Sequence, residues 1–245
     1  MAFRLQTVGV ITNEFDLSKY VTRGEMASIA TTYAKIPAST STQAFKDVAP
    51  EHPFYHQIGA LYNMGVVTGD ENGNFHPDAY VTYDEALVYI INAIGHKPFA
   101  VREGGYPTGY HRIAIKHGML ENLSMNKGTD KATLGDIYRM LDEGLTAATV
   151  IETYYGNGDA TYTLSTTETF LSSIYNINLY RGIVTAVQGT SLDSLDPKLG
   201  KDQIRINGKL YELGGYPEFN WTHPTKFLFN TFFIVIHNVF FNSFL

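Results

Sequence analysis

The most informative residues for chemistry form the tetrapeptide Thr22-Arg23-Gly24-Glu25, which opens a helical pattern. A Thr and a Glu three positions apart can form a capping box, in which each side chain accepts from a backbone amide near the other residue. Arg23 follows the cap, where a cation opposes the helix macrodipole, so helix stability does not explain it. A guanidinium can hold a carboxylate or phosphate bidentately, and the positive helix start reinforces that attraction. The tetrapeptide therefore predicts an anion site at Arg23.

The cap pattern occurs twice more along the chain. Thr82 is followed by Glu85, and Thr133 is followed by Asp136, which makes a weaker box because Asp is shorter. Each Thr is explained as a helix cap worth about 1 kcal/mol, and a direct contact with ligand is the alternative for each.

The position of Arg23 is taken by Tyr83 in the second pattern and by Leu134 in the third. Neither side chain can pair with an anion as Arg does. We therefore expect the Arg23 site to dominate anion recognition and Tyr83 to stack on a sugar at most.

Other tyrosines are candidates for stacking on sugars, because an aromatic ring offers a broad apolar face with a polar tip. Packing in the core or at its rim is the alternative for each. The candidates are Tyr20, Tyr80, Tyr83, Tyr106 and Tyr110.

Metal chemistry is poorly supported. Asp70, Asn72 and Asn74 have the spacing of a calcium loop, but Phe75 and Val81 stand where such a loop needs Gly and Glu, so the pattern predicts a turn. His52 and His56 are four apart, but Pro53 lies between them and no third ligand is close in the sequence. We expect neither a metal nor a cofactor.

Catalytic patterns are also weak. The chain has no cysteine, and no phosphate-binding loop or ordered Ser, His and Asp set stands out. Pairs of acids such as Glu143 and Glu152 arise by chance in a chain with 24 acids. The sequence predicts a protein that is not an enzyme.

The elements that carry the caps are repeated. In each copy a short apolar stretch ends at a glycine, a polar loop follows, and a Thr opens a second helical pattern. These copies predict three helix-loop-helix units over residues 5–36, 45–97 and 105–148, of which the first lacks the segment that matches 45–60. The glycines are Gly9, Gly65 and Gly118.

The second copy resembles a full S-layer homology repeat. It runs from Phe45 to Leu87, FKDVAPEHPFYHQIGALYNMGVVTGDENGNFHPDAYVTYDEAL, and VTRGEMA at Val21 is similar to the Thr-Arg-Ala-Glu motif of that family, with Gly24 in place of Ala. The resemblance covers roughly residues 5–148. It implies three repeats in a pseudo-threefold arrangement, with helices packed centrally and grooves that hold secondary cell-wall polymers, often pyruvylated.

The rest of the chain differs in composition from the repeats. Residues 149–215 predict a small β-rich module, with a strand at Arg181–Gly189 and a type I′ hairpin at Asn207-Gly208. Residues 216–245 form an atypical apolar tail, of which Phe227–Leu245 has no charge. A membrane span is one interpretation, disfavoured by the asparagines. The other interpretation is that the tail is not genuine coding sequence, because A/T-rich DNA read out of frame encodes many Phe, Ile, Asn and Leu residues.

Charge and composition limit the partners. The net charge of -6 argues against a general nucleic-acid binder, and 44% hydrophobic residues suffice for a core. No apolar run at the N-terminus is long enough for an export signal. Because the first copy lacks a counterpart of residues 45–60, we expect Met1 to be an internal or misassigned start, with a signal peptide and half a repeat upstream.

These observations predict a mainly α N-terminal region over residues 1–148 and a small β-rich C-terminal module. The resemblance implies anchoring at a bacterial cell surface through glycan-binding residues, the partner being an anionic or pyruvylated polymer on peptidoglycan. A structural S-layer or adhesion subunit that self-associates is the alternative, as is the anchor of a surface enzyme whose catalytic domain lies outside the chain. The candidate binding residues are Thr22, Arg23, Glu25, Thr82, Tyr83, Glu85, Thr133 and Asp136.

Overall fold

The computed structural model describes residues 2–11, 16–37, 43–154, 160–182, 184–187, 190–191, 199, 203–212 and 232–237. The chain divides into two compact units, Met1–Tyr175 and Asn176–Leu245.

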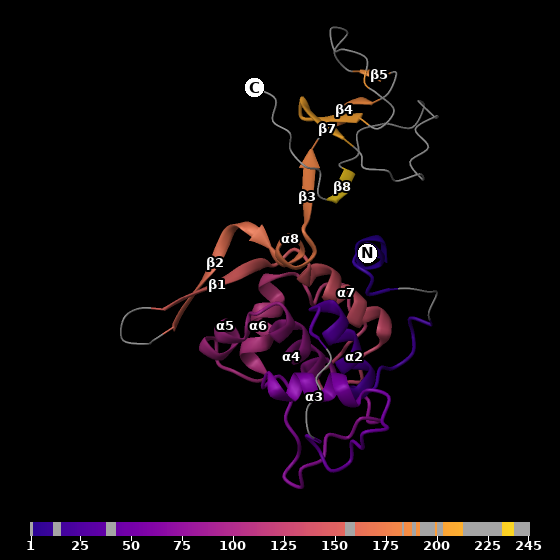
Figure 1. The fold of residues 1–245 in the computed structure, drawn as a ribbon, viewed down its shortest axis with the longest axis vertical. Coiled ribbons are helices and arrows are strands. Elements are labelled where there is room, and N and C mark those ends of the chain that lie inside the picture. Colours follow the sequence, from indigo (N-terminus) through magenta and orange to yellow (C-terminus); the bar gives the residue numbers. More distant parts are fainter. Residues whose placement is uncertain are drawn as a thin grey trace. The chain divides into compact units, whose positions relative to one another are not determined.

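The first unit is mainly helical, as the sequence predicted (Figure 1). Three helices of equal length, α2, α4 and α7, follow the three Thr caps, and the other helices pack around them. Its elements are α1 (Ala2–Thr7), α2 (Arg23–Tyr33), α3 (Tyr55–Asn63), α4 (Tyr83–Ala93), α5 (Lys97–Arg102), α6 (Thr108–Lys116), α7 (Leu134–Gly144), β1 (Ala148–Tyr154), β2 (Ala160–Thr169) and α8 (Phe170–Tyr175).

The three helix starts are joined by a closed ring of backbone hydrogen bonds. The residue before each capping Thr donates its amide to the equivalent residue of another copy: Val81 to Val21 at 2.9 Å, Ala132 to Val81 at 2.9 Å, and Val21 to Ala132 at 3.2 Å. All three residues are fully buried. We call Val21, Val81 and Ala132 the central ring. It fixes the three helix starts at one place in the core.

The ring is extended by the first helical amides. The Arg23 amide donates to the Ala79 carbonyl, the Tyr83 amide to Asp130 and the Leu134 amide to Lys19, at 2.8 to 3.1 Å. Such amides have no partner within their own helix, so their bonds to a neighbouring copy join the three copies through backbone alone.

Each central helix packs against a helix from another copy. α2 packs on α3, α4 on α6, and α7 on α1. Arg4 of α1 holds Asp142 of α7 through two hydrogen bonds of 2.9 and 2.5 Å, and Leu5 is fully buried. The three packing pairs therefore form a cycle, because α1 of the first copy packs on α7 of the third copy.

The glycines predicted to stop the outer helices do so. Gly9, Gly65 and Gly118 follow α1, α3 and α6 with φ of 75°, 64° and 70°. The next amide in each case bonds back to a carbonyl in the last turn, as in a Schellman cap.

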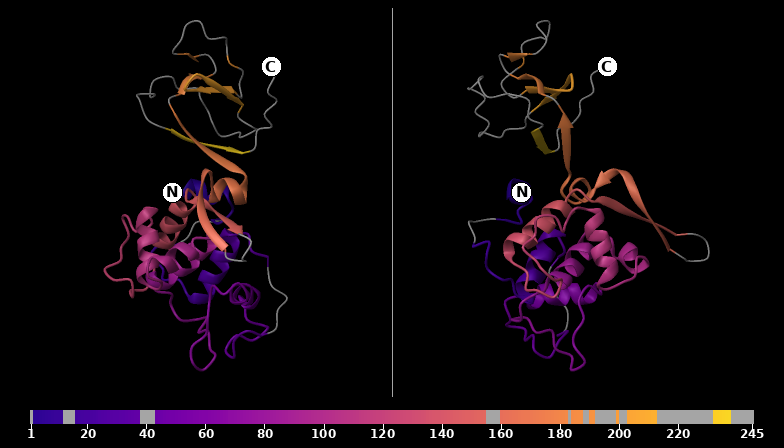
Figure 2. Two further views of the ribbon diagram at one scale, coloured as in Figure 1. Left: turned by 90° about the vertical axis from the view of Figure 1, so that its left-hand side faces the viewer. Right: turned by 180° about the vertical axis from the view of Figure 1, so that it is seen from behind.

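A two-stranded antiparallel ribbon, β1 with β2, extends from the helices (Figure 2). α8 returns to the core, where the Tyr175 hydroxyl donates to the Tyr33 carbonyl at 2.7 Å and the Tyr33 hydroxyl donates to the Leu141 carbonyl at 2.9 Å. The compact unit thus runs past residue 148, to Tyr175.

The second unit contains β3 (Ile177–Gly182), β4 (Val184–Val187), β5 (Thr190–Ser191), β6 (Gln203–Ile206), β7 (Lys209–Glu212) and β8 (Phe232–His237). The predicted hairpin is confirmed: β6 pairs with β7, and Asn207 and Gly208 have φ of 49° and 79°, as a type I′ turn requires. The strand predicted at Arg181–Gly189 is confirmed at 181–182 and 184–187, but these residues belong to two strands, β3 and β4, that pair in separate sheets. Residues 183, 188 and 189 lie outside the described ones.

Most of the apolar tail lies outside the described residues. β8 falls within it and pairs antiparallel with β3. Among the described residues, no helix is both long and apolar enough to span a membrane.

Two histidines meet beneath β1. The His117 Nε2 lies 3.2 Å from the His96 Nδ1, and the His96 Nε2 lies 2.8 Å from the Ala148 carbonyl oxygen. Burial, with His96 and Lys116 adding to it, lowers the pKa of His117 to about 4, and burial also lowers the pKa of His96. The His117 imidazole is therefore neutral in the folded chain above a pH of about 4, and the lowered pKa of His96 favours its neutral form as well.

This pair predicts that stability falls with acid. Between an ordinary His pKa near 6.5 and the folded value near 4, the unfolded chain binds more protons, so folding is fully favoured above that window and weakened as pH falls through it. We expect His117→Asn to flatten this decline, measured as the urea midpoint between pH 7.5 and 4.5. An equally steep decline in the variant would contradict the assignment.

Candidate functional site

The three Thr residues are caps, as the sequence predicted. Thr22 and Thr82 each form a full capping box with the Glu three positions later. Thr133 accepts from the Asp136 amide at 3.3 Å, and the Asp136 carboxylate is used elsewhere. The third box is therefore only half formed.

The first residue of a central helix pairs with an acid of the next copy, the one that stands three positions after the capping Thr. These pairs were not predicted from the sequence. Arg23 forms an ion pair with Glu85, and the Tyr83 hydroxyl donates to the Asp136 carboxylate at 2.6 Å. The third such pair would join Leu134 to Glu25, but Leu134 is apolar and Glu25 binds Lys19 instead, at 2.9 Å. In the sequence, the paired side chains occupy equivalent positions in the three copies. Their pairing follows only from the way in which the three helix starts meet in the fold.

Arg23 is held on three sides. Its Nε donates to the Phe75 carbonyl at 2.9 Å, its guanidinium lies 4.7 Å from the centre of the Phe75 ring, and Nη1 binds Glu85. Its side chain is 17% exposed. Within the described residues, Nη2 has no hydrogen-bond partner, so one edge of the guanidinium is available to a ligand.

Two sequence expectations about Arg23 need correction. A protein carboxylate, that of Glu85, already accompanies the charge, so a ligand is not needed to explain it. The helix start also offers no free amide at this end, because the Arg23 and Gly24 amides bind the Ala79 and Pro77 carbonyls and the Glu25 amide binds Thr22. Any anion at Arg23 is held by the side chain and not by the helix N-terminus.

Gly24 stands at a position where a Cβ atom would clash. A Cβ atom there would lie 2.7 Å from the Phe54 ring and 3.2 Å from the Pro77 carbonyl oxygen. The close approach of this loop to the start of α2 therefore requires glycine.

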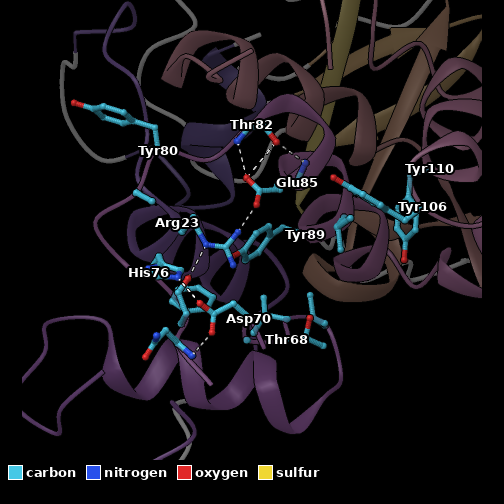
Figure 3. A pocket seen from close by; sticks show the side chains of 17 residues that line it. Arg23, Thr68, Asp70, His76, Tyr80, Thr82, Glu85, Tyr89, Tyr106 and Tyr110 are labelled. Atoms are coloured by element: carbon cyan, nitrogen blue, oxygen red, sulfur yellow. Dashed lines mark hydrogen bonds and ion pairs between the residues drawn. The ribbon is translucent and has the colours of Figure 1, made fainter. Parts of the chain in front are cut away.

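Arg23 borders a cavity of about 680 Å³ between α2, α4 and the loop of the second copy (Figure 3). Its walls combine charged groups with aromatic and β-branched side chains. They include Arg23, Thr68, Asp70, His76, Tyr80, Glu85, Val88, Tyr89, Tyr106 and Tyr110.

The loop that forms one wall is stabilised by its own acids. The Asp70 carboxylate accepts from the Asn74 amide at 2.8 Å and the Asn72 amide at 2.9 Å, and its other oxygen lies 2.8 Å from the His76 ring nitrogen. These bonds, the Asn74 amide first, lower the pKa of Asp70 to about 2. Asp70 therefore acts in the turn that the sequence predicted.

The candidate tyrosines separate into two groups. Tyr80 and Tyr106 line the cavity and are about half exposed, so their faces can reach a ligand. Tyr110 also lines the cavity but is 6% exposed, and Tyr20, which packs against Tyr80, lies outside it. Tyr83 is 2% exposed, so the sugar stacking expected of it does not fit its place in the core.

Among the described residues, no group of three or more His, Asp or Glu side chains is placed to hold a metal ion. The cavity is open to solvent and is lined by aromatic rings, an Arg and two carboxylates, so it suits a polar ligand with apolar faces. Such a ligand would present both hydrogen-bond donors and acceptors, as a sugar does.

Comparison with known proteins finds one family match and several similar proteins. Residues 44–87 match the S-layer homology domain. The chain is 31% identical to a cell surface protein of Thermoanaerobacter kivui over 148 residues, 57% of this chain and 18% of that protein. It is 24% identical to the surface layer protein of Brevibacillus choshinensis over 233 residues, 86% of this chain and 20% of that protein.

A third similarity is to the middle cell wall protein of Brevibacillus brevis, 27% identical over 152 residues, 58% of this chain and 14% of that protein. The chain thus spans about a fifth or less of each relative's length. Residues 44–87 therefore match one S-layer homology domain, and the chain is similar to S-layer and other cell-surface proteins.

The Arg23–Glu85 pair predicts an energetic link between two copies. We expect a double-mutant cycle with Arg23→Gln and Glu85→Gln to give a coupling energy of about 1 kcal/mol in urea unfolding, because both side chains are partly exposed. The cycle removes the separate cost to the Thr82 cap. Additive effects of the two changes would show that the pair contributes nothing to stability.

Proposed function

We propose that this chain anchors a bacterial surface protein by binding secondary cell-wall polysaccharide, without catalysis, and that the Arg23 cavity is its main binding site. The observation that carries the proposal is the cavity itself, which combines one cation with exposed aromatic faces in a domain of the S-layer homology family.

The proposal extends the match at residues 44–87 to three repeats in a pseudo-threefold arrangement. It is supported by the central ring, in which Val21, Val81 and Ala132 make the same hydrogen bond in turn. The division into a repeat region to 148, a β module and the tail from 216 stays a prediction.

The ligand we propose is an anionic or pyruvylated glycan. Arg23 would hold the acidic group through its available edge, and the Glu85 and Asp70 carboxylates would accept hydrogen bonds from sugar hydroxyls. Tyr80 and Tyr106, half exposed at the cavity, would pack against sugar faces. At the equivalent junction Leu134 stands in place of Arg23, so the helix start supplies no guanidinium there, which makes the three sites unequal.

The test is sedimentation with wall sacculi of Brevibacillus brevis. We expect binding to native sacculi and its loss after hydrofluoric acid extraction of the secondary polymer. Arg23→Ala should weaken binding by about 1.5 to 3 kcal/mol, the range for a hydrogen bond to a charged group. The change should also lower stability, since it breaks the pair with Glu85.

Arg4→Ala is the matched control, because it breaks the ion pair with Asp142 and does not line the cavity. It should lower the melting temperature and leave the affinity of the folded protein unchanged. Binding that survives extraction would overturn the proposal in favour of self-association or direct contact with peptidoglycan. Equal affinities of wild type and Arg23→Ala would remove Arg23 from the site.

A further inference from the structure

The hydroxyl of Tyr89 stands out in the cavity wall. Tyr89 is 2% exposed, and among the described residues no group hydrogen-bonds to its Oη. A buried tyrosine hydroxyl normally has a partner, because burying an unpaired polar group is costly. The residue lines the cavity, and Figure 3 shows its aromatic ring near the Arg23 side chain.

The two other copies show that the fold does not need a hydroxyl here. Tyr89 lies seven residues after Thr82, and the same place after Thr22 and Thr133 is taken by Ile29 and Met140. Met140 is fully buried. An apolar side chain therefore suffices at this point of the helix, and the hydroxyl belongs to the second copy alone.

We propose that the Tyr89 hydroxyl binds the ligand of this cavity, donating, together with Arg23, to the acidic group of the bound glycan. This inference rests on the proposed function and adds a specificity-determining residue to it. Two donors that line one cavity favour a ligand rich in acceptor oxygens, and a carboxylate or phosphate offers several.

The electrostatic surroundings agree. Burial raises the pKa of Tyr89 well above its usual value, so the group stays protonated and can donate at neutral pH. The charge of Arg23 lowers the pKa of Tyr89 and that of Glu85 raises it.

The hydroxyl oxygen is itself covered in the unliganded chain. We therefore expect side chains around the Arg23–Glu85 pair to shift and uncover the hydroxyl when the acidic group binds the available edge of Arg23. Glu85 would keep its bond to the Thr82 amide, at 2.9 Å, and so remain as the helix cap. Binding would then require rearrangement of side chains only, which is common at binding sites.

Tyr89→Phe tests the inference because it removes only the hydroxyl. The probe is the polysaccharide released from the same sacculi, measured by calorimetry with the full chain. We expect the variant to bind at least fivefold more weakly and to melt no lower than wild type, since an unpaired hydroxyl is lost. With polymer whose carboxyl groups have been amidated, wild type and variant should bind equally.

Tyr83→Phe is the matched control, because the Tyr83 hydroxyl has a protein partner in Asp136. It should lower the melting temperature and leave affinity unchanged. Equal affinity of wild type and Tyr89→Phe for native polymer would overturn the inference, and equal weakening on both polymers would overturn the assignment to an acidic group. Failure of wild type to bind native polymer would instead reject the proposed function.

Discussion

Three backbone hydrogen bonds among Val21, Val81 and Ala132 are the constraint on which the helical unit depends. Each bond satisfies a fully buried amide, so breaking one would leave polar groups unpaired in the core. The bonds form a cycle, so each helix start is positioned by both of its neighbours. The helices that pack around the three central helices follow the same cyclic order, and α1 completes the cycle by packing on α7.

The ring also determines which side chains meet. It brings the first residue of one central helix to the acid of the next, and sequence differences at that point give each junction its own chemistry. Tyr83 with Asp136 makes a buried hydrogen bond, whereas Arg23 with Glu85 makes an ion pair at the edge of a cavity. Near-symmetric backbones thus carry unequal sites, and the second copy adds the Tyr89 hydroxyl to one of them alone.

Local features were predictable from the sequence because they depend on residues close together in the chain. The caps at Thr22 and Thr82, the stop at Gly65 and the turn at Asn207-Gly208 all follow from local backbone chemistry. The partner of Arg23 was not predictable, since Glu85 lies 62 positions away and is reached only through the ring. Burial of Tyr83 was missed for the same reason.

Amide chemical shifts of the labelled chain during titration with wall polysaccharide test most directly whether one junction forms the site. We predict changes at Arg23, at residues 68–76 and at Tyr89, with the amides of the central ring still protected from hydrogen exchange. Changes concentrated at Tyr83 or Leu134, or shared equally among the three helix starts, would contradict the account.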